Sequence, residues 1–384
     1  MGLSPGFDAV VVGAGVVGLA AASELARTGR SVLILERRAG IGQEATSRNS
    51  QVIHAGLYYP PGSLKADLCC RGRELLYAWL EARGVPHRKL GKLVVASDEA
   101  ELTKLEALIA RGQANGVPGL RMLGARDTQI REPALAVAGA LYSPESGILD
   151  AARFALSLLA EAEAQGATLL LNHEVIGLGR GSGGWQVVVR TAGGEDEESL
   201  ACEVVINAGG LASDSLAQAA GIDIDARGYR QRPCKGNYFA LQASAGLRLS
   251  HLVYPVPPSP SEAEAGGLGI HATPDLNGGL RFGPDAHYTE KIDFGVDPAA
   301  AGRFASAVRR YLPEVREDQL VADFAGVRSK LAGPGEGFRD FVVQEETDAG
   351  APGLINCIGI ESPGLTASLA IGERVAALLQ GRVR

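Results

Sequence analysis

The sequence lacks the features that would mark a metalloprotein, a nucleic-acid-binding protein or a membrane-spanning protein. Its five cysteines are scattered, with only Cys69 and Cys70 adjacent, so they form neither a zinc ligand set nor a CxxC redox pair. The formal net charge is −7 and the pI is near 5.5, which leaves no basic surface for nucleic acid. No apolar run approaches the roughly 20 residues of a membrane-spanning helix. We therefore expect reduced structural thiols, no metal and no nucleic-acid partner.

The chain also contains no internal repeat and no low-complexity tract. With 384 residues, 46% of them hydrophobic, it can bury a large core and is expected to form two lobes. Only six residues precede the first predicted strand, too few for a signal peptide, so the sequence favours a cytoplasmic location. Peripheral contact with the inner face of the membrane stays open, because segments distant in sequence can assemble an interfacial patch.

The sequence does contain a glycine-rich turn between a predicted strand and a predicted helix. Gly13, Gly15 and Gly18 form a GxGxxG after the apolar residues 10–12 and before the alanine-rich stretch 19–27. The first glycine permits the tight turn, the second lets the backbone approach a pyrophosphate, and the third allows close packing of the helix. The N-terminus of that helix presents free N–H groups to the anion.

A second predicted strand supports the same interpretation. Residues 31–35 are typical of a buried parallel strand and end at Glu36, whose carboxylate would accept a hydrogen bond from a ribose hydroxyl. A GxGxxG alone is a weak signal, because glycine-rich turns are common. Strand, glycine turn, helix and a second strand that ends in an acid together predict a dinucleotide-binding unit.

The two predicted lobes interleave along the chain. The N-terminus, a middle segment and the C-terminus carry the patterns of one dinucleotide-binding domain, and short strand-like runs fill the segments between them. We assign 1–84, 143–220 and 325–384 to the dinucleotide-binding domain. The segments 85–142 and 221–324 would form a substrate domain with a mixed sheet.

Individual elements can be placed from periodicity and from turn residues. We expect helices at 151–165, 298–311 and 366–379, strands at 92–96, 167–172, 237–241, 268–272 and 280–282, and a hairpin of 183–190 with 199–207. That hairpin leads into Ala208, Gly209 and Gly210, a second glycine turn that brings backbone close to a ligand. The loop 257–267, rich in Pro, Ser, Glu and Ala, would shape the mouth of a pocket.

Six strings, spread over nearly the whole chain, resemble one enzyme superfamily. In chain order they are TSRNSQVIHAGLYYPPGSLKA, KGNYF, HLVYPVP, GLGIHATPDLNGGLRFGPDA, AGVRSKL and GIESPGLTASLAIGE. The chain resembles the FAD-dependent D-amino-acid-oxidase-like oxidoreductase superfamily, and within it the L-2-hydroxyglutarate dehydrogenase/oxidase group. The resemblance implies a two-lobed α/β (α+β) fold, with an interrupted Rossmann-type FAD-binding domain and a mixed-sheet substrate domain.

The resemblance also implies that the dinucleotide is FAD, held without a covalent bond. The side chains of 46–50 would meet the pyrophosphate and the ribityl chain, although a polar turn would explain the same run. Residues 52–56 would lie against the isoalloxazine ring, where the small Ala55 and Gly56 let the backbone pack on a flat surface. The residues that we expect to contact FAD are Gly13, Gly15, Gly18, Glu36, Arg37, Thr46, Ser47, Arg48, Asn49, Ser50, His54, Val175, Ala208, Gly209, Gly359, Ser362, Pro363, Gly364, Leu365 and Thr366.

His54 and the C-terminal string would lie at the redox centre. By resemblance, His54 is close to the flavin, where an imidazole can act chemically or serve as a hydrogen-bonded core residue, and both roles stay open. The string GIESPG precedes the helix 366–379, whose N-terminus would stabilise negative charge on the reduced flavin by about 0.3 to 2 kcal/mol. A simple helix cap is the alternative.

One arginine matches the substrate-binding position of the superfamily. Arg328 completes the G-x-R of AGVRSKL, and its guanidinium can hold a carboxylate through two parallel donors. A solvated surface arginine is the alternative. Tyr254 and Tyr238 could donate to a carboxylate or could be core residues with satisfied hydroxyls. A dicarboxylate needs a second cation, for which the unranked candidates are Lys330, Lys235, Arg281 and Arg48.

His271, in GIHATP, is the expected proton acceptor of the reaction. By resemblance it faces substrate from a predicted strand, where a neutral imidazole within hydrogen-bond reach of a hydroxyl can take its proton. A strand histidine that merely satisfies its neighbours is the alternative. Surface or structural positions are expected for the remaining four histidines, His87, His173, His251 and His287.

The resemblance implies oxidation of L-2-hydroxyglutarate to 2-oxoglutarate by hydride transfer to the flavin, with electrons passed to a quinone or to oxygen. The residues alone support dinucleotide binding, an arginine for a carboxylate and a histidine for proton transfer. An amine or amino-acid oxidase on the same fold is the alternative, and since a free amine needs no dedicated base, His271→Ala would separate the two. A flavin-binding module that senses redox state without its own substrate is a third interpretation.

Overall fold

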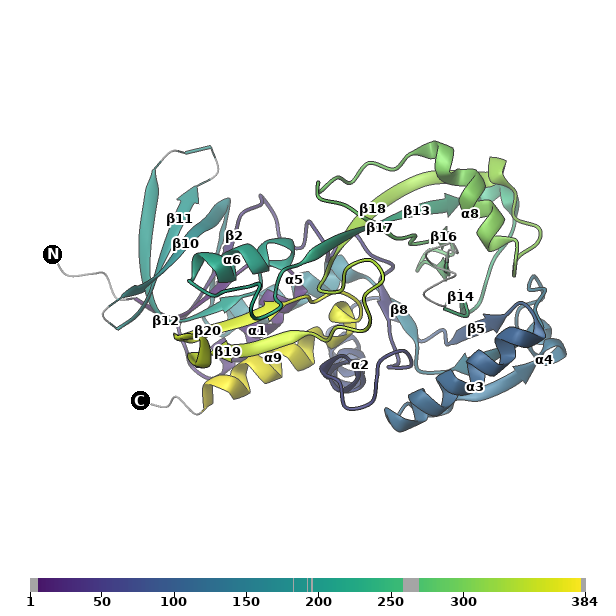
Figure 1. Ribbon diagram of the computed structural model, residues 1–384, viewed down its shortest axis with the longest axis horizontal. Helices are drawn as coiled ribbons and strands as arrows, with labels where there is room; N and C mark the ends of the chain where they lie inside the picture. Colours follow the sequence, from purple (N-terminus) through teal and green to yellow (C-terminus); the bar gives the residue numbers. More distant parts are fainter. Residues whose placement is uncertain (1–5, 182, 192, 195, 258–268, 381–384) are drawn as a thin grey trace.

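We describe residues 6–181, 183–191, 193–194, 196–257 and 269–380 of a computed structural model of the chain. Two large sheets organise these residues, and the chain crosses between them several times. Figure 1 shows an elongated molecule in which the N-terminal strands and the last helix share one end, while the second sheet occupies the other.

The first sheet has a parallel centre, as the glycine-turn unit predicts. Its order is β10-β11-β12-β1-β2-β9, with β20 beside β12 and β19 beside β20. The pairs β1 with β2, β1 with β12, β2 with β9, and β12 with β20 are parallel. Its strands are β1 (Phe7–Val12), β2 (Val32–Glu36), β9 (Thr168–Leu171), β10 (His173–Gly181), β11 (Gly184–Thr191), β12 (Glu197–Asn207), β19 (Val342–Glu346) and β20 (Ala351–Ile358).

The two faces of this sheet pack against different elements, because successive strand residues point to opposite faces. Val11 and Ile34 belong to a core shared with four helices, whereas Val10 and Leu33 pack with Trp185 of the β10–β11 hairpin and with α6. Burial on both faces explains why β1 and β2 are continuous apolar runs. The helices are α1 (Val16–Arg27), α2 (Leu64–Ala82), α5 (Ala151–Ala164) and α9 (Gly364–Gln380) on the first face, and α6 (Ser213–Ala219) on the second.

The second sheet is mixed. Its order is β17-β13-β16-β15-β14-β5-β7-β6, with β18 beside β13, and β14 with β5 is a parallel pair. Helices α3 (Glu99–Ala114), α4 (Ala125–Arg131) and α8 (Ala301–Val308) accompany it. Its strands are β5 (Lys92–Ala96), β6 (Arg121–Gly124), β7 (Gly139–Ser143), β13 (Arg232–Leu241), β14 (Leu252–Pro255), β15 (Ala272–Pro274), β16 (Leu280–Phe282), β17 (His287–Tyr288) and β18 (Leu320–Lys330).

A small third sheet lies in the connections between the large ones. It pairs β3 (Val52–Ile53) with β8 (Gly147–Leu149), and β8 with β4 (His87–Arg88). It holds the segment that follows β3, which carries His54, against α2 and α9, because Ile53 packs in the same core as those helices.

Most of the predicted elements are present, with shifted ends. The strands 92–96 and 280–282 are confirmed, and so are the helix that begins at Ala151 and the hairpin now seen as β11 and β12. The expected helix 298–311 is shorter: a 3-10 turn, Pro298–Ala300, capped by Asp297, precedes α8. The five cysteines are free thiols.

Two expectations for the second sheet differ from the structure. The strand expected at 268–272 begins only at Ala272, and residue 268 and most of the loop 257–267 lie outside the described residues. His271 therefore precedes β15, with its carbonyl accepting from Gly283 N at 3.0 Å. β18 crosses the expected domain boundary at 324/325 without a break, because it pairs with β13 along almost its whole length.

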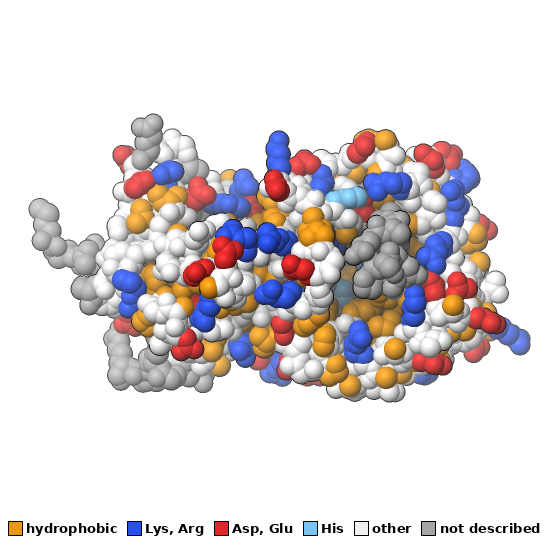
Figure 2. All heavy atoms as spheres, in the orientation of Figure 1, with side chains coloured by type: hydrophobic (Ala, Val, Ile, Leu, Met, Phe, Trp, Pro, Cys, Tyr) orange, Lys and Arg blue, Asp and Glu red, His pale blue; other side chains and the backbone are white. Residues whose placement is uncertain are grey.

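The described helices include none with both the length and the apolar composition to cross a membrane. Figure 2 shows Lys and Arg side chains interspersed with Asp and Glu over the face in view.

Candidate active site

A cavity of about 330 Å³ connects the two large sheets. Its walls include Val12, Leu35 and Ala208 at the carboxyl ends of β1, β2 and β12, and Tyr238 and Tyr254 of the second sheet. Ligands of open parallel sheets bind at the carboxyl ends of the strands. The cavity therefore extends from the predicted dinucleotide end to the predicted substrate end.

The glycine turn has the geometry that a dinucleotide requires. Gly13 has φ +103°, and a Cβ there would lie 2.6 Å from the carbonyl oxygen of Ala208. A Cβ on Gly18 would collide with the carbonyl oxygen of Gly13. Gly15, at the N-cap of α1, lines the cavity and has no side chain of its own to cap the helix. The turn thus leaves a backbone cradle and an open helix N-terminus for an anion.

Glu36 lies at the end of β2, where it lines the cavity. Its Oε1 accepts from Arg38 N at 2.8 Å and its Oε2 from Ala14 N at 2.9 Å, so two backbone amides fix the carboxylate. Each oxygen keeps a lone pair for a further donor such as a ribose hydroxyl. Arg37 also lines the cavity and pairs with Glu44 at 2.7 Å.

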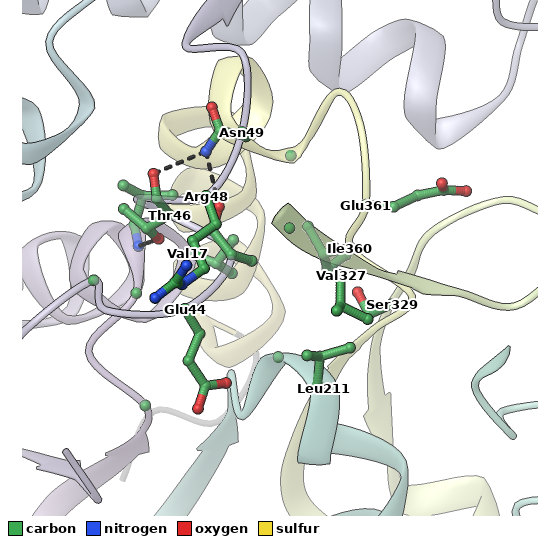
Figure 3. Close-up of a pocket in the computed structure, with 18 of the residues that line it drawn as sticks. Val17, Glu44, Thr46, Arg48, Asn49, Leu211, Val327, Ser329, Ile360 and Glu361 are labelled. Atoms are coloured by element: carbon green, nitrogen blue, oxygen red, sulfur yellow. Dashed lines mark hydrogen bonds between the residues drawn. The ribbon is translucent and has the colours of Figure 1, made fainter. Parts of the chain in front are cut away.

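The segment 44–50 forms one wall of the cavity, opposite Val327 and Ile360 (Figure 3). Asn49 Nδ2 donates to the carbonyls of Ala45 and Thr46 at 2.8 Å, so this side chain fixes the turn. Thr46 Oγ1 accepts from Val16 N at 3.1 Å, which ties the turn to α1. Ser47, whose hydroxyl donates to the Glu44 carbonyl, does not line the cavity.

Arg48 and Ser50 join this wall to the second sheet. A Cβ on Gly326 of β18 would collide with the Arg48 carbonyl oxygen, so backbone meets backbone there. Ser50 Oγ and Tyr238 Oη share a hydrogen bond of 3.1 Å. Arg48 stacks over Phe294 at 4.3 Å, and its buried Nε has no hydrogen-bond partner among the described residues.

His54 is fixed beside the start of α9. Its backbone N donates to Thr366 Oγ1 at 2.9 Å, and its Nε2 shares a hydrogen bond of 3.2 Å with Ser362 Oγ. Its buried Nδ1 has no partner in the described part of the chain. Burial, and next the charge of Lys92, lower the pKa of His54 well below its ordinary value. The ring is therefore a neutral imidazole on the cavity wall.

The C-terminal string brings a helix start to the cavity. Ser362, Pro363, Gly364 and Leu365 line it, and α9 begins at Gly364. Gly359, with φ +70°, and Thr366 lie behind this wall, where Thr366 Oγ1 donates to the Val52 carbonyl at 3.3 Å. The positive end of the α9 helix dipole supports negative charge at this point of the cavity.

His271 and Tyr254 form a stacked pair on the substrate side. Their ring centroids are 3.5 Å apart with planes inclined by 6°, and both residues line the cavity. Burial is the main cause that lowers the pKa of His271 well below its ordinary value, and the charges of Lys92 and Arg328 lower it further. The His271 imidazole is therefore neutral and able to accept a proton.

Arg328 reaches the cavity from β18 and is held by backbone oxygens. Its Nη2 donates to the Asp285 carbonyl at 2.7 Å, and its Nε donates to the Cys234 carbonyl at 3.4 Å. The Asp285 carboxylate is buried and accepts from Asn237 N at 2.7 Å and from His287 Nε2 at 2.8 Å. These contacts fix the guanidinium at the cavity wall.

The structure brings only part of the expected substrate set to the cavity. Lys235 pairs with Asp293, and Lys330 lies 5.5 Å over the Tyr288 ring, so neither lines it. Arg281 pairs with Asp323 at 2.7 Å and also lies outside. Arg48 is the one candidate second cation whose side chain lines the cavity.

Two side chains at or near the site differ from the sequence-based interpretation. His173, expected to be a surface or structural residue, lines the cavity together with Val175. Asn172 turns the chain just before it, with φ +60° and its backbone N donating to the Arg38 carbonyl at 3.0 Å. Lys92, which no motif in the sequence singles out, is buried behind Tyr254. A lysine at the head of the apolar run KLVVA is the signal that could have identified it.

Three comparisons with known proteins agree with this geometry. The family described as "FAD dependent oxidoreductase" matches residues 8–378. The chain is 40% identical to "L-2-hydroxyglutarate dehydrogenase, mitochondrial" of Arabidopsis thaliana, over 96% of this chain and 82% of the relative. It is 32% identical to the Homo sapiens protein of that name, over 98% and 89%. An L-alpha-glycerophosphate oxidase from Mycoplasma pneumoniae, solved with FAD bound, matches with TM-score 0.85 and 27% identity, covering 98% of this chain and 95% of that one.

Proposed function

Because the chain belongs to the family of FAD-dependent oxidoreductases, we propose that it oxidises the CH–OH group of L-2-hydroxyglutarate to give 2-oxoglutarate. Electrons would pass from FAD to a quinone or to oxygen. The observation that carries the proposal is one cavity that joins a glycine turn to a neutral histidine and an arginine, His271 and Arg328. The choice of L-2-hydroxyglutarate as substrate rests on the names of the similar dehydrogenases.

The residues present fit FAD. Gly13 and Gly15 leave backbone free for the pyrophosphate at the N-terminus of α1, and Glu36 would accept from the ribose. FAD supplies the two-electron acceptor when bound. His54 is hydrogen-bonded through its backbone and through Nε2, which supports a neutral ring that contacts the flavin without a covalent bond.

The substrate would be held by its carboxylates. Arg328, fixed by the Asp285 and Cys234 carbonyls, offers charge-assisted donors to the carboxylate beside the reacting carbon. Tyr254 and Tyr238 line the same space and can donate through their hydroxyls. Arg48 is our choice for the distal carboxylate, because it lines the cavity and the other three candidate cations do not.

His271 would accept the proton of the substrate hydroxyl. Oxidation of an alcohol removes this proton as the carbon-bound hydrogen leaves with its electron pair, so a base within hydrogen-bond reach is needed. The His271 ring lies on the cavity wall in its neutral form, which can take the proton. His54 is the second candidate, and its contact with Ser362 favours a supporting role.

The proposal can be tested by anaerobic reduction of the flavin. Purified yellow protein would be mixed separately with L-2-hydroxyglutarate, its D-enantiomer, L-lactate, L-malate, glycerol 3-phosphate and glycine, and the oxidised flavin band followed. We expect L-2-hydroxyglutarate to bleach it fastest. Fastest reduction by glycine would support an amine oxidase instead, and no reduction by any compound would support a flavin-binding module without its own substrate.

A further inference from the structure

Lys92 is a buried lysine to which the proposed reaction assigns no role. It begins β5, pairs with Leu252 of β14, and is 1% exposed. Burial of an ammonium group is costly unless it is paired. Within the described residues no carboxylate forms an ion pair with it, and its Nζ lies instead 3.8 Å from the ring centroid of Tyr254 and 5.4 Å from that of Tyr58.

The Tyr254 ring separates this ammonium from His271. The imidazole stacks on Tyr254 with centroids 3.5 Å apart, and the ammonium lies 3.8 Å from the same centroid. Two groups so close to one centroid would overlap on a single face, so they occupy opposite faces, roughly 7 Å apart. Tyr254 and His271 line the cavity and Lys92 does not. The ammonium therefore lies directly behind the wall that His271 presents to a ligand.

We propose that Lys92 is a positioning residue for the reaction: its ammonium, held behind Tyr254, adds to the effect of burial and keeps the stacked His271 imidazole unprotonated, and so able to accept the substrate proton, down to a lower pH. The inference rests on the proposed function for the role of His271. A fixed positive charge at this distance disfavours a second one, and the aromatic ring between them excludes the water that would screen it.

The charged and titratable groups around this pair come from several elements. Lys92 is faced by Tyr58, Tyr254, Cys69 and His54, and His271 is faced by Tyr254, Lys92, His54 and Arg328. Burial lowers the pKa of Lys92 to about 7, and burial with the neighbouring cations holds the pKa of His271 well below its ordinary value. Below pH 7 the lysine is therefore charged while the histidine is still neutral.

The direct test is the pKa of His271 in the FAD-loaded protein without substrate. Imidazole ¹⁵N NMR can follow it, with the signal assigned by its loss in His271→Asn. Lys92→Met removes the charge at similar volume, and we expect the pKa of His271 to rise by about one pH unit. Lys92→Arg keeps the charge and should restore the original value. Lys89→Met is the matched control, because Lys89 is an exposed lysine that also lies over a tyrosine ring.

An unchanged His271 pKa in Lys92→Met would overturn the proposal. If that variant does not fold, Lys92→Gln is a second neutral variant with the same expected rise and the same overturning result. The acid limb of kcat/KM should also move to higher pH in the neutral variants, and their difference from the wild type should fade above about pH 7, where Lys92 loses its own proton. Because the NMR titration needs no substrate, failure of L-2-hydroxyglutarate to reduce the wild-type flavin would refute the proposed function alone.

Discussion

The cofactor end and the substrate end of the cavity are built in opposite ways. The cofactor end depends on the backbone of one short turn, where Gly13 and Gly18 pack so closely against carbonyl oxygens that a side chain would collide with them. The substrate end depends on side chains of separate segments: Tyr254 from β14, His271 before β15 and Arg328 from β18. A change at the first end should act through shape, and a change at the second through charge and hydrogen bonding.

The largest effect is expected from a methyl group in the glycine turn. In Gly18→Ala, the new Cβ would collide with the Gly13 carbonyl oxygen, so α1 and the turn must move apart. We expect loss of bound FAD and a fall of about 3 kcal/mol in the free energy of unfolding, the upper range for overpacking. Flavin absorbance per protein and urea unfolding measure both.

Gly179→Ala is the matched control for that substitution. A Cβ at Gly179 in β10 meets no atom of the described residues within 4 Å, so flavin content and unfolding should match the wild type. If Gly18→Ala also kept its FAD, the cofactor end would not depend on the shape of the turn.

At the substrate end, Arg328→Lys should impair catalysis while FAD stays bound. Lysine cannot reproduce the parallel donors of the guanidinium, and loss of one charge-assisted hydrogen bond of about 2 to 3 kcal/mol corresponds to a roughly 100-fold lower kcat/KM. Stopped-flow reduction by L-2-hydroxyglutarate measures this. Arg281→Lys is the control, because Arg281 pairs with Asp323 outside the cavity, and an equal loss there would argue against a specific role for Arg328.

The smallest effect should appear in how the free energy of unfolding depends on pH. This measurement compares His54, at the cofactor end of the cavity, with His271, at the substrate end. The pKa values of His54 and His271 are lowered in the folded protein, so below about pH 6.5 the unfolded chain binds more protons. The free energy of unfolding should therefore fall as pH falls, by up to about 1.4 kcal/mol per pH unit for each histidine. Urea unfolding between pH 5.5 and 7.5 measures this slope.

His54→Asn and His271→Asn should each flatten the slope. His87→Asn is the control, since the His87 Nδ1 is hydrogen-bonded at the Val85 carbonyl and the residue does not line the cavity. If His54→Asn and His271→Asn both kept the wild-type slope of the free energy of unfolding against pH, the two imidazoles would not be buried in the neutral form.

The cofactor end, built from one local segment, could be predicted from the sequence more fully than the substrate end, which is built from separate segments. The GxGxxG between a strand and a helix is a local pattern, and its turn, its helix and the strand that ends at Glu36 are all present. The helix beginning at Ala151 could likewise be predicted, because its periodicity and its Asp150 cap lie within one segment. Local signals therefore predicted the parallel sheet and its turn.

The substrate end could be predicted only in part, because it is assembled from distant segments. Lys235 and Arg328 lie on neighbouring strands, yet Lys235 pairs with Asp293 outside the cavity, and nothing local in the sequence separates the two. Lys92 gains its neighbour Tyr254 through the pairing of β5 with β14, which are more than 150 residues apart. Such contacts follow from sheet order, which periodicity does not specify.

The contact between Gly326 and the Arg48 carbonyl fixes how deep the substrate strand lies relative to the cofactor segment. Backbone packs on backbone at this contact, and Ser50 hydrogen-bonds Tyr238 beside it. The position of β18, and with it the position of Arg328, is therefore fixed relative to the cofactor segment. In the proposed reaction, this contact would fix the distance from the flavin to a carboxylate held by Arg328. A redesign toward longer or bulkier acids must therefore reshape the opposite wall at Tyr254 and His271, because β18 cannot move away from the segment that carries Arg48.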